Sequence, residues 1–246
     1  KILDTILSPQ AIDEILANPL YRYHCGAVLS KGRLGSENIT QQKIAMAAAF
    51  TSNGFGRNAH LKRMDRVVFA DPRAEPSLLG NDAYKTHRVE FTEANFRAAV
   101  QSSGSIPVIM HGVKNVEAAP AGILRDGGLL DYHPIPSNIS NDNGLVLYPH
   151  FYPELTAGWF DKYFPWRKTT AAQMDNVILI SPSQKCLEQT ELKRIPDRRD
   201  FLKYEGKDEL RKKLWWESAN ISLEMGEEFL NVISSGEIAN RVQLIG

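Results

Sequence analysis

Short apolar runs that alternate with helix-forming segments are the feature that most restricts the fold of this 246-residue chain. In chain order the runs are YRYHCGAVLS, DRVVFAD, THRVEF, GILRDGG, GLVLYPHF and DNVILISPS. The last contains an almost continuous row of β-branched residues and leucine, which is typical of strands covered on both faces of a sheet. Strands that alternate with helices in this way predict a layered α/β fold.

Capping signals place three helices between these runs. Ser8 caps a short helix, and Thr92 caps another that begins EANF. Ser36 or Asn38 caps a longer helix that ends near a glycine, at position 54. Helices of this length between strands fit the crossovers of an α/β protein.

The character of the chain changes near residue 183, where lysine, arginine, aspartate and glutamate become frequent and mixed. Apolar residues then recur at helical spacing, at Leu210, Leu214, Ile221, Met225, Phe229 and Val232. One long helix or a helix pair accounts for this period. We therefore expect residues 1–182 to form the α/β core, and residues 183–246 to form a charged, mainly helical C-terminal segment that packs on it.

Composition excludes several functional classes. Lysine plus arginine equals aspartate plus glutamate, at 29 each, so no net charge points to nucleic acid. Cys25 and Cys186 belong to no CxxC motif and suit a reducing, cytoplasmic compartment. We find no apolar run of about 18 residues and no signal-peptide pattern in KILDTILSPQ. Because the chain does not begin with Met, we expect a processed product or a piece of a longer protein.

One acidic residue stands at the end of an apolar run, in the stretch AGILRDGGLLDYHPIP. Asp126 is followed at once by Gly127 and Gly128. Open α/β sheets bind ligands beyond the carboxyl ends of their strands, which makes this carboxylate a candidate site residue. The glycines allow positive φ angles and the close approach of another backbone. A tight surface turn is the alternative, because Asp-Gly is a frequent turn pair.

Residues 86–136 resemble the C-terminal half of the patatin-like phospholipase family. In that family a helix ends in small residues before a proline, as SSGSIP does at residues 102–107. The family's D-G-G/A motif follows about twenty residues later, matched by the triplet at 126–128, with apolar residues and Pro134 after it. The resemblance implies a three-layer α/β sandwich of the patatin-like type with a mainly parallel central sheet.

The resemblance also implies a serine–aspartate dyad hydrolase that cleaves phospholipids or other acyl lipids without a metal or organic cofactor. A serine hydroxyl is a weak nucleophile and needs an adjacent base. In the family the motif aspartate takes the serine proton directly, so Asp126 is the expected catalytic base. Desolvation of such a carboxylate raises its basicity.

The family's nucleophile lies on a G-x-S-x-G elbow. No serine of this chain has glycine both two positions before it and two positions after it. Two interpretations stay open. In the first, the chain is the C-terminal part of an ester hydrolase whose serine lies elsewhere, and this part alone is inactive. In the second, it is a catalytically inactive lipid-binding or interaction protein on the same fold.

A group of histidines and aspartates offers a third interpretation, a metal-dependent hydrolase. Its members are His111, Asp126, Asp131, His133, Asp142 and His150. No pair among them has the HxH or HxxxH spacing that is typical of metal sites. Hydrogen-bonded loop residues are the competing interpretation.

Aromatic residues gather in residues 150–168, HFYPELTAGWFDKYFPWRK. On a helix, Trp159, Phe160, Tyr163 and Phe164 would share one face, with Arg167 and Lys168 after them. Aromatic rings beside basic residues bind at membrane interfaces, and packing into the core is the alternative. Farther on, Trp215 and Trp216 are adjacent, so on a helix they point about 100° apart and cannot share one narrow buried stripe.

Overall fold

The computed structural model describes residues 2–74, 82–135, 144–167, 169–170, 173–174 and 176–243. It divides into two compact units. Unit 1 comprises residues 1–144 and 155–169, and unit 2 comprises residues 145–154 and 170–246. Residues 145–154 and 170–182 therefore group with the charged C-terminal segment. The expected packing of residues 183–246 on the α/β core stays a prediction.

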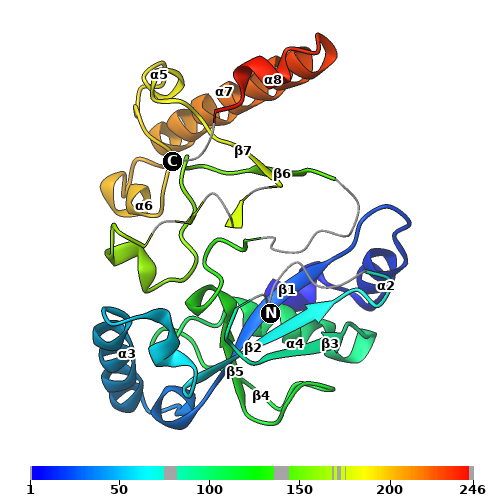
Figure 1. The fold of residues 1–246 in the computed structure, drawn as a ribbon, viewed down its shortest axis with the longest axis vertical. Helices are drawn as coiled ribbons and strands as arrows, with labels where there is room; N and C mark the ends of the chain where they lie inside the picture. Colours follow the sequence, from blue (N-terminus) through cyan, green and yellow to red (C-terminus); the bar gives the residue numbers. More distant parts are fainter. Residues whose placement is uncertain are drawn as a thin grey trace. The chain divides into compact units, whose positions relative to one another are not determined.

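Unit 1 is built on a five-stranded sheet (Figure 1). The strands are β1 (His24–Ser30), β2 (Met64–Ala70), β3 (Thr86–Glu90), β4 (Val113–Lys114) and β5 (Ile123–Asp126), in the order β3-β2-β1-β5-β4. β2 and β3 run parallel, whereas the other three neighbouring pairs are antiparallel. The α/β class is confirmed, but the expected mainly parallel sheet is wrong.

The error arose because an apolar run in the sequence indicates the burial of a strand but not its direction. Six of the seven residues of β2 are buried, because the strand is covered on both faces. Burial on both faces demands apolar side chains whichever way the neighbouring strand runs. Strand direction depends on pairings between distant segments, such as Ala27 with Asp126, and a local composition does not encode them.

Helices connect the strands of unit 1. They are α1 (Ile2–Ile6), α2 (Pro9–Ala17), α3 (Ile39–Asn53) and α4 (Glu93–Ser103), with single 3₁₀ turns η1 (Gly32–Gly35), η2 (Arg57–His60), η3 (Gly127–Leu129) and η4 (Asp161–Tyr163). The predicted caps are confirmed: the side chains of Ser8, Asn38 and Thr92 each accept a backbone N–H in the first turn. Each cap satisfies an N–H group that has no partner inside its helix.

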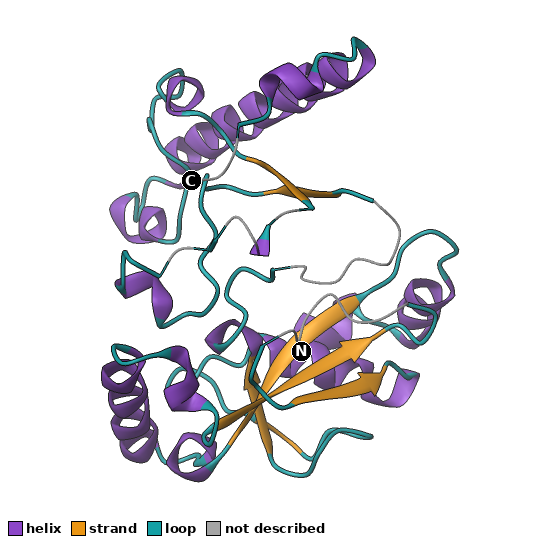
Figure 2. Ribbon diagram, viewed as in Figure 1, coloured by secondary structure: helices purple, strands orange, loops and turns teal. Residues whose placement is uncertain are grey.

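The sheet of unit 1 has an apolar core on each face. In Figure 1 and Figure 2, α4 lies behind the strands and α3 stands to their left. On one face, Ala27 of β1 and Phe69 of β2 belong to a core that includes Phe96 of α4. On the other face, Val28 of β1 belongs to a second core that includes Ala49 of α3. Consecutive residues of β1 thus point into different cores, as the pleat of a strand requires.

The aromatic segment does not form the expected helix. Within residues 155–167 the structure has only the turn η4. Phe160 is buried and stacks on the ring of His60, with centroids 5.2 Å apart, whereas Tyr163 and Trp166 are 50% and 72% exposed. Tertiary bonds override the helical pattern, because the buried Asp161 carboxylate accepts the N–H of Gly158 and bonds from two side chains outside the segment. Lys168 lies outside the described residues.

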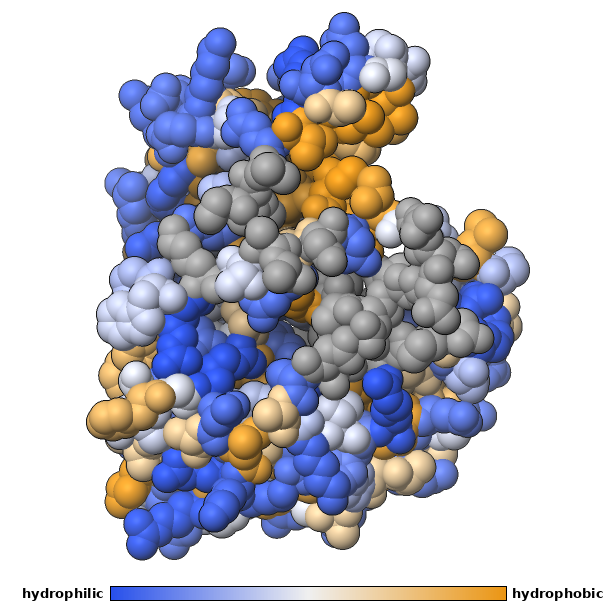
Figure 3. Space-filling model, viewed as in Figure 1, coloured by the Kyte–Doolittle hydropathy of each residue, from blue (hydrophilic) through white to orange (hydrophobic). Residues whose placement is uncertain are grey.

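Unit 2 holds a pair of parallel strands, β6 (Val146–Pro149) and β7 (Val177–Ile180). Its helices are α5 (Gln184–Leu187), α6 (Arg199–Lys203), α7 (Asp208–Ser234) and α8 (Ile238–Arg241). The predicted long C-terminal helix is confirmed in α7. Among the described residues of unit 2, only Met174 and Leu214 are buried apolar side chains. Apolar residues instead gather on its surface, along α7 and over the two strands (Figure 3).

None of the helices in the described ranges combines the length and apolar character needed to cross a lipid bilayer.

Candidate functional site

Asp126 is the last residue of β5. Its backbone N–H donates to the carbonyl of Ser105 at 3.1 Å, and its Oδ1 accepts the N–H of Gly128 at 2.7 Å. The other oxygen, Oδ2, accepts no hydrogen bond from any residue that the structure describes. Burial raises the pKa of Asp126, and the bond from Gly128 offsets part of that rise. The side chain is therefore a half-buried carboxylate with increased basicity.

Gly127 is required by a close approach of two backbones. A Cβ at this position would lie 2.3 Å from the carbonyl oxygen of Gly26 in β1, which no side chain permits. At Gly128 a Cβ would lie 3.0 Å from Asp126 Oδ1 and would crowd the carboxylate. Neither glycine has a positive φ, so of the two expected reasons for this pair only the close approach is confirmed.

The segment between α4 and β4 supports Asp126 from one side. Ser105 provides the carbonyl that binds the Asp126 N–H, and three residues later Val108 has a φ of 72°. A β-branched residue in this region is strained, and here its N–H donates to the buried side chain of Gln42 at 2.6 Å. This bond fixes the segment against α3.

Arg125, the residue before Asp126, is fully buried. Its guanidinium donates to the carbonyls of Leu34, Ser36 and Met110 and to the Glu37 carboxylate, at 2.9–3.3 Å. One buried side chain thus joins two segments, residues 34–37 and the residues around Met110, near the end of β5. A group in such a network has little freedom to move, which holds the backbone of Asp126 in place.

The segment after the glycines is fixed by two arginines. The fully buried Arg66 makes two hydrogen bonds to Asp131, at 2.7 and 2.8 Å, and two to Asp82, both at 2.7 Å. Arg57 donates to the carbonyl of Leu130 at 2.9 Å and to Asp161 at 3.0 Å. We call Arg57, Arg66, Asp131 and Asp161 the anchor, because they hold residues 129–131 in place.

A buried histidine extends the anchor. Asn53 donates to Asp161 Oδ1 at 2.9 Å, and its amide oxygen lies 3.1 Å from His60 Nε2. Burial, and then the positive charge of Arg63, lower the pKa of His60 to about 4. His60 is therefore neutral at physiological pH.

Two serines of the SSGSIP stretch bond to the end of α4, whereas Ser137 and Ser140, nearer to Asp126 in sequence, lie outside the described residues. Ser102 Oγ donates to the carbonyl of Ala99, and Ser105 Oγ donates to that of Gln101, both at 2.7 Å. Both hydroxyls thus bond to backbone carbonyls of α4. Asp126 is thus a base with a free oxygen, and the described residues provide no nucleophile bonded to it.

The other members of the histidine and aspartate group have separate roles. His111 bonds Glu37 at 2.6 Å, Asp131 bonds Arg66, and His133 Nδ1 accepts the N–H of Thr156. His150 belongs to unit 2, and Asp142 lies outside the described residues. In the ranges that the structure covers, no three His, Cys, Asp or Glu side chains form a group that could hold a metal ion.

Sequence reasoning missed the two arginines of the anchor. Arg66 lies inside the run DRVVFAD, where a charged residue in a strand with six buried positions was a usable signal. A buried arginine requires carboxylate partners, and Asp131 is one of them. Arg57 follows α3 in a glycine-rich turn, and nothing in its local sequence pointed to Leu130.

Comparison of the chain with protein-family models, with curated proteins and with solved structures gives no match.

Proposed function

We propose that this chain is the part of a lipid acyl hydrolase that carries the catalytic aspartate. The enzyme is a carboxylic ester hydrolase of the patatin-like, serine–aspartate type, and it acts in the cytoplasm on phospholipids or other acyl lipids, in lipid degradation. The chain has no serine in a G-x-S-x-G context, so the nucleophile comes from outside these 246 residues. On its own the chain is inactive.

The environment of Asp126 is the observation that carries the proposal. A structural turn aspartate has no use for a raised pKa or an unpaired oxygen, whereas a general base needs both. Asp126 combines them at the end of β5. The motif resemblance of residues 102–134 is independent support.

The proposed reaction assigns one task to Asp126. Its Oδ2 takes the serine proton as the serine oxygen attacks the ester carbonyl, and the proton then passes to the departing alcohol. Water then attacks the acyl-serine and gives its proton to the same carboxylate, and this proton passes to the serine oxygen as the fatty acid is released. The rigid support from Arg125 and the anchor keeps Oδ2 in the position that both transfers need.

Peripheral contact with a membrane belongs to the proposal, because the substrate lies in a bilayer. Tyr163 and Trp166 are exposed, and the Lys162 ammonium lies 4.5 Å from the centroid of the Trp159 ring and 4.9 Å from that of Tyr163. Exposed aromatic rings with a cation among them suit the headgroup region of a lipid surface.

The test uses the protein extended by the segment that carries its serine. We expect wild type to react with a fluorophosphonate probe and to hydrolyse phospholipid vesicles. Asp126→Asn should lower hydrolysis by about a hundredfold or more, because the serine loses its base. The matched control is Asp13→Asn, the same change at an exposed position of α2, which should leave the rate unchanged. Equal rates for Asp126→Asn and wild type would contradict the assignment.

The same preparation distinguishes the proposed hydrolase from the inactive lipid-binding alternative. That alternative expects vesicle binding without hydrolysis in wild type, and binding unaffected by Asp126→Asn. Replacement of Tyr163 and Trp166 by alanine tests the membrane contact. We expect weaker co-sedimentation with vesicles, and unchanged co-sedimentation would exclude this surface.

A further inference from the structure

Helix α7 has an apolar stripe that faces away from its own unit. The stripe consists of Trp216, Ala219, Leu223, Gly226, Leu230 and Ile233, which we call the α7 stripe. Its four large side chains are 68%, 68%, 63% and 45% exposed, in chain order. At 1.5 Å per residue the stripe is about 25 Å long. An exposed apolar surface of this length on a long helix marks an interaction site.

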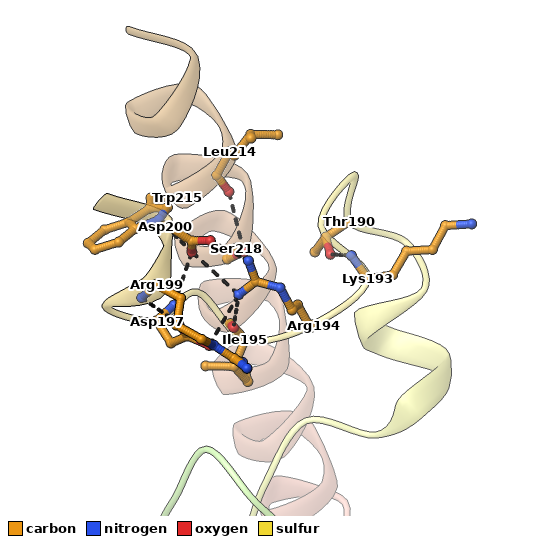
Figure 4. A network of polar contacts seen from close by, with 10 residues as sticks. All are labelled: Thr190, Lys193, Arg194, Ile195, Asp197, Arg199, Asp200, Leu214, Trp215 and Ser218. Carbon is orange, nitrogen blue, oxygen red and sulfur yellow. Dashed lines mark hydrogen bonds and ion pairs between the residues drawn. The ribbon is translucent and has the colours of Figure 1, made fainter. Parts of the chain in front are cut away.

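A different face of α7 holds the helix to unit 2. Leu214 is buried, and the indole of Trp215 donates to the fully buried Asp200 at 3.2 Å (Figure 4). Arg194 also binds the Asp200 carboxylate, which fixes the N-terminal part of α7 to residues 194–200. Trp216, next along the helix, points away from this face and is exposed, as the angle between adjacent residues requires. The stripe is therefore not the face that α7 uses within its own unit.

The spacing of the α7 stripe is that of a coiled-coil seam. Its positions are separated by three, four, three, four and three residues. This 3-4 pattern keeps one side of a helix against a partner helix. Large residues at 216, 223 and 230 alternate with small ones at 219 and 226, and Ile233 completes the last pair. A partner must offer small residues where the stripe offers large ones.

A second copy of the same helix, running antiparallel, meets that requirement. With the symmetry axis between residues 223 and 226, Leu223 lies opposite Gly226, Leu230 opposite Ala219, and Trp216 opposite Ile233 of the other copy. A parallel copy would instead set tryptophan against tryptophan and glycine against glycine, which leaves both crowding and voids.

We propose that the α7 stripe binds a second copy of this chain, so that two α7 helices pack antiparallel in a symmetric dimer. The interface is isologous, because each copy presents the same stripe. The small residues at 219 and 226 let the helices approach closely along the middle of the seam. Gly226 has no other structural reason, since a Cβ there would meet no atom within 4 Å.

Sedimentation velocity of the 246-residue chain over a wide concentration range tests the dimer. We expect wild type to sediment as a dimer and Gly226→Leu to raise the dissociation constant by at least about tenfold. Because leucine favours helix more than glycine and meets no clash within the protomer, the same variant should keep or raise its melting temperature. Asn231→Leu adds the same side chain at an exposed position of α7 outside the stripe, and should leave the constant unchanged.

An exchange of large and small side chains tests the orientation. Adding Leu223→Ala to Gly226→Leu should restore the dimer, because each new leucine then faces an alanine of the other copy. A wild-type chain that stays monomeric at every concentration overturns the proposal. So does a dimer that is indifferent to Gly226→Leu, and a double variant that stays monomeric overturns the antiparallel arrangement.

Discussion

The two ends of the segment Asp126–Asp131 carry the same side chain in opposite surroundings. Asp131 receives two hydrogen bonds from the buried Arg66 guanidinium. Asp126 receives one bond, from a backbone N–H, and has no cationic partner among the described residues. Four residues therefore separate a carboxylate paired with a cation from a carboxylate with raised basicity.

Under the proposed function, the difference explains how the fold keeps a basic carboxylate without losing the segment that carries it. Fixing the chain requires strong bonds, and a cation near Asp126 would have lowered the basicity that the proposed chemistry needs. The anchor provides the bonds at a distance, through Arg66 and Arg57, and leaves Asp126 without a counter-ion. Reactivity and stability are thus assigned to different aspartates.

Removal of the anchoring cation should have the largest effect on stability. Arg66→Met leaves Asp131 and Asp82 without their shared partner, and we expect a loss of about 4 kcal/mol in the free energy of unfolding. Urea denaturation at neutral pH measures it. Arg88→Met removes an exposed arginine from β3 and should change stability by less than about 0.5 kcal/mol. Similar losses in the two variants would show that the anchor does not stabilise the fold.

Acid should destabilise the chain through His60, because burial beside the anchor keeps this ring neutral in the folded state. The pKa of His60 is about 4 in the folded chain and about 6.5 when unfolded, so the unfolded state takes up its proton first as the pH falls. Stability is then lost as the pH falls from about 6.5 toward 4, by about 3 kcal/mol in total. Urea denaturation at several pH values should show a smaller loss over this range in His60→Gln. An equal loss of unfolding free energy with falling pH in wild type and His60→Gln would contradict the role of His60.

Replacing Asp131 or Asp126 by asparagine compares the two ends of the segment most directly, and its expected effects on stability are the smallest. Asp131→Asn weakens the pairing with Arg66 and should cost about 2 kcal/mol. Asp126→Asn should be neutral or slightly stabilising at pH 7. The raised pKa means that the folded chain binds the Asp126 proton more tightly than the unfolded chain does. Stability therefore falls as the pH rises from the unfolded pKa of Asp126 to its folded pKa. Asparagine does not titrate, so the variant does not lose this stability. Thermal unfolding at pH 7 compares the two variants, and a reversed order would refute the assignment of roles.

Local patterns in the sequence predicted those parts of the fold that depend on local interactions. Ser8, Asn38 and Thr92 cap helices where expected, because a cap is formed within four residues. The strand that ends at Asp126 was also predicted. The mixed direction of the sheet was not, since it depends on pairings such as β1 with β5, almost a hundred residues apart.

The candidate site likewise has one part that depends on local sequence and another that depends on distant contacts. The D-G-G triplet is local, and it identified Asp126 and the need for a close backbone approach at Gly127. The anchor is not local, because Arg66 and Asp131 lie 65 residues apart and neither has a motif around it. The helix expected in the aromatic segment failed for a related reason, since distant Asn53 and Arg57 determine where Asp161 lies.

The two partners of Arg66 also have an order in time. Asp82 lies 16 residues along the chain from the arginine, and Asp131 lies 65 residues away. Each doubling of a closed loop adds about 0.6 kcal/mol of chain entropy, so the longer closure is less favourable by about 1.2 kcal/mol. We therefore expect Arg66 to meet Asp82 first during folding, and to bind Asp131 once the sheet has brought β5 beside β1. The same arginine that stabilises the finished segment makes its assembly a late event.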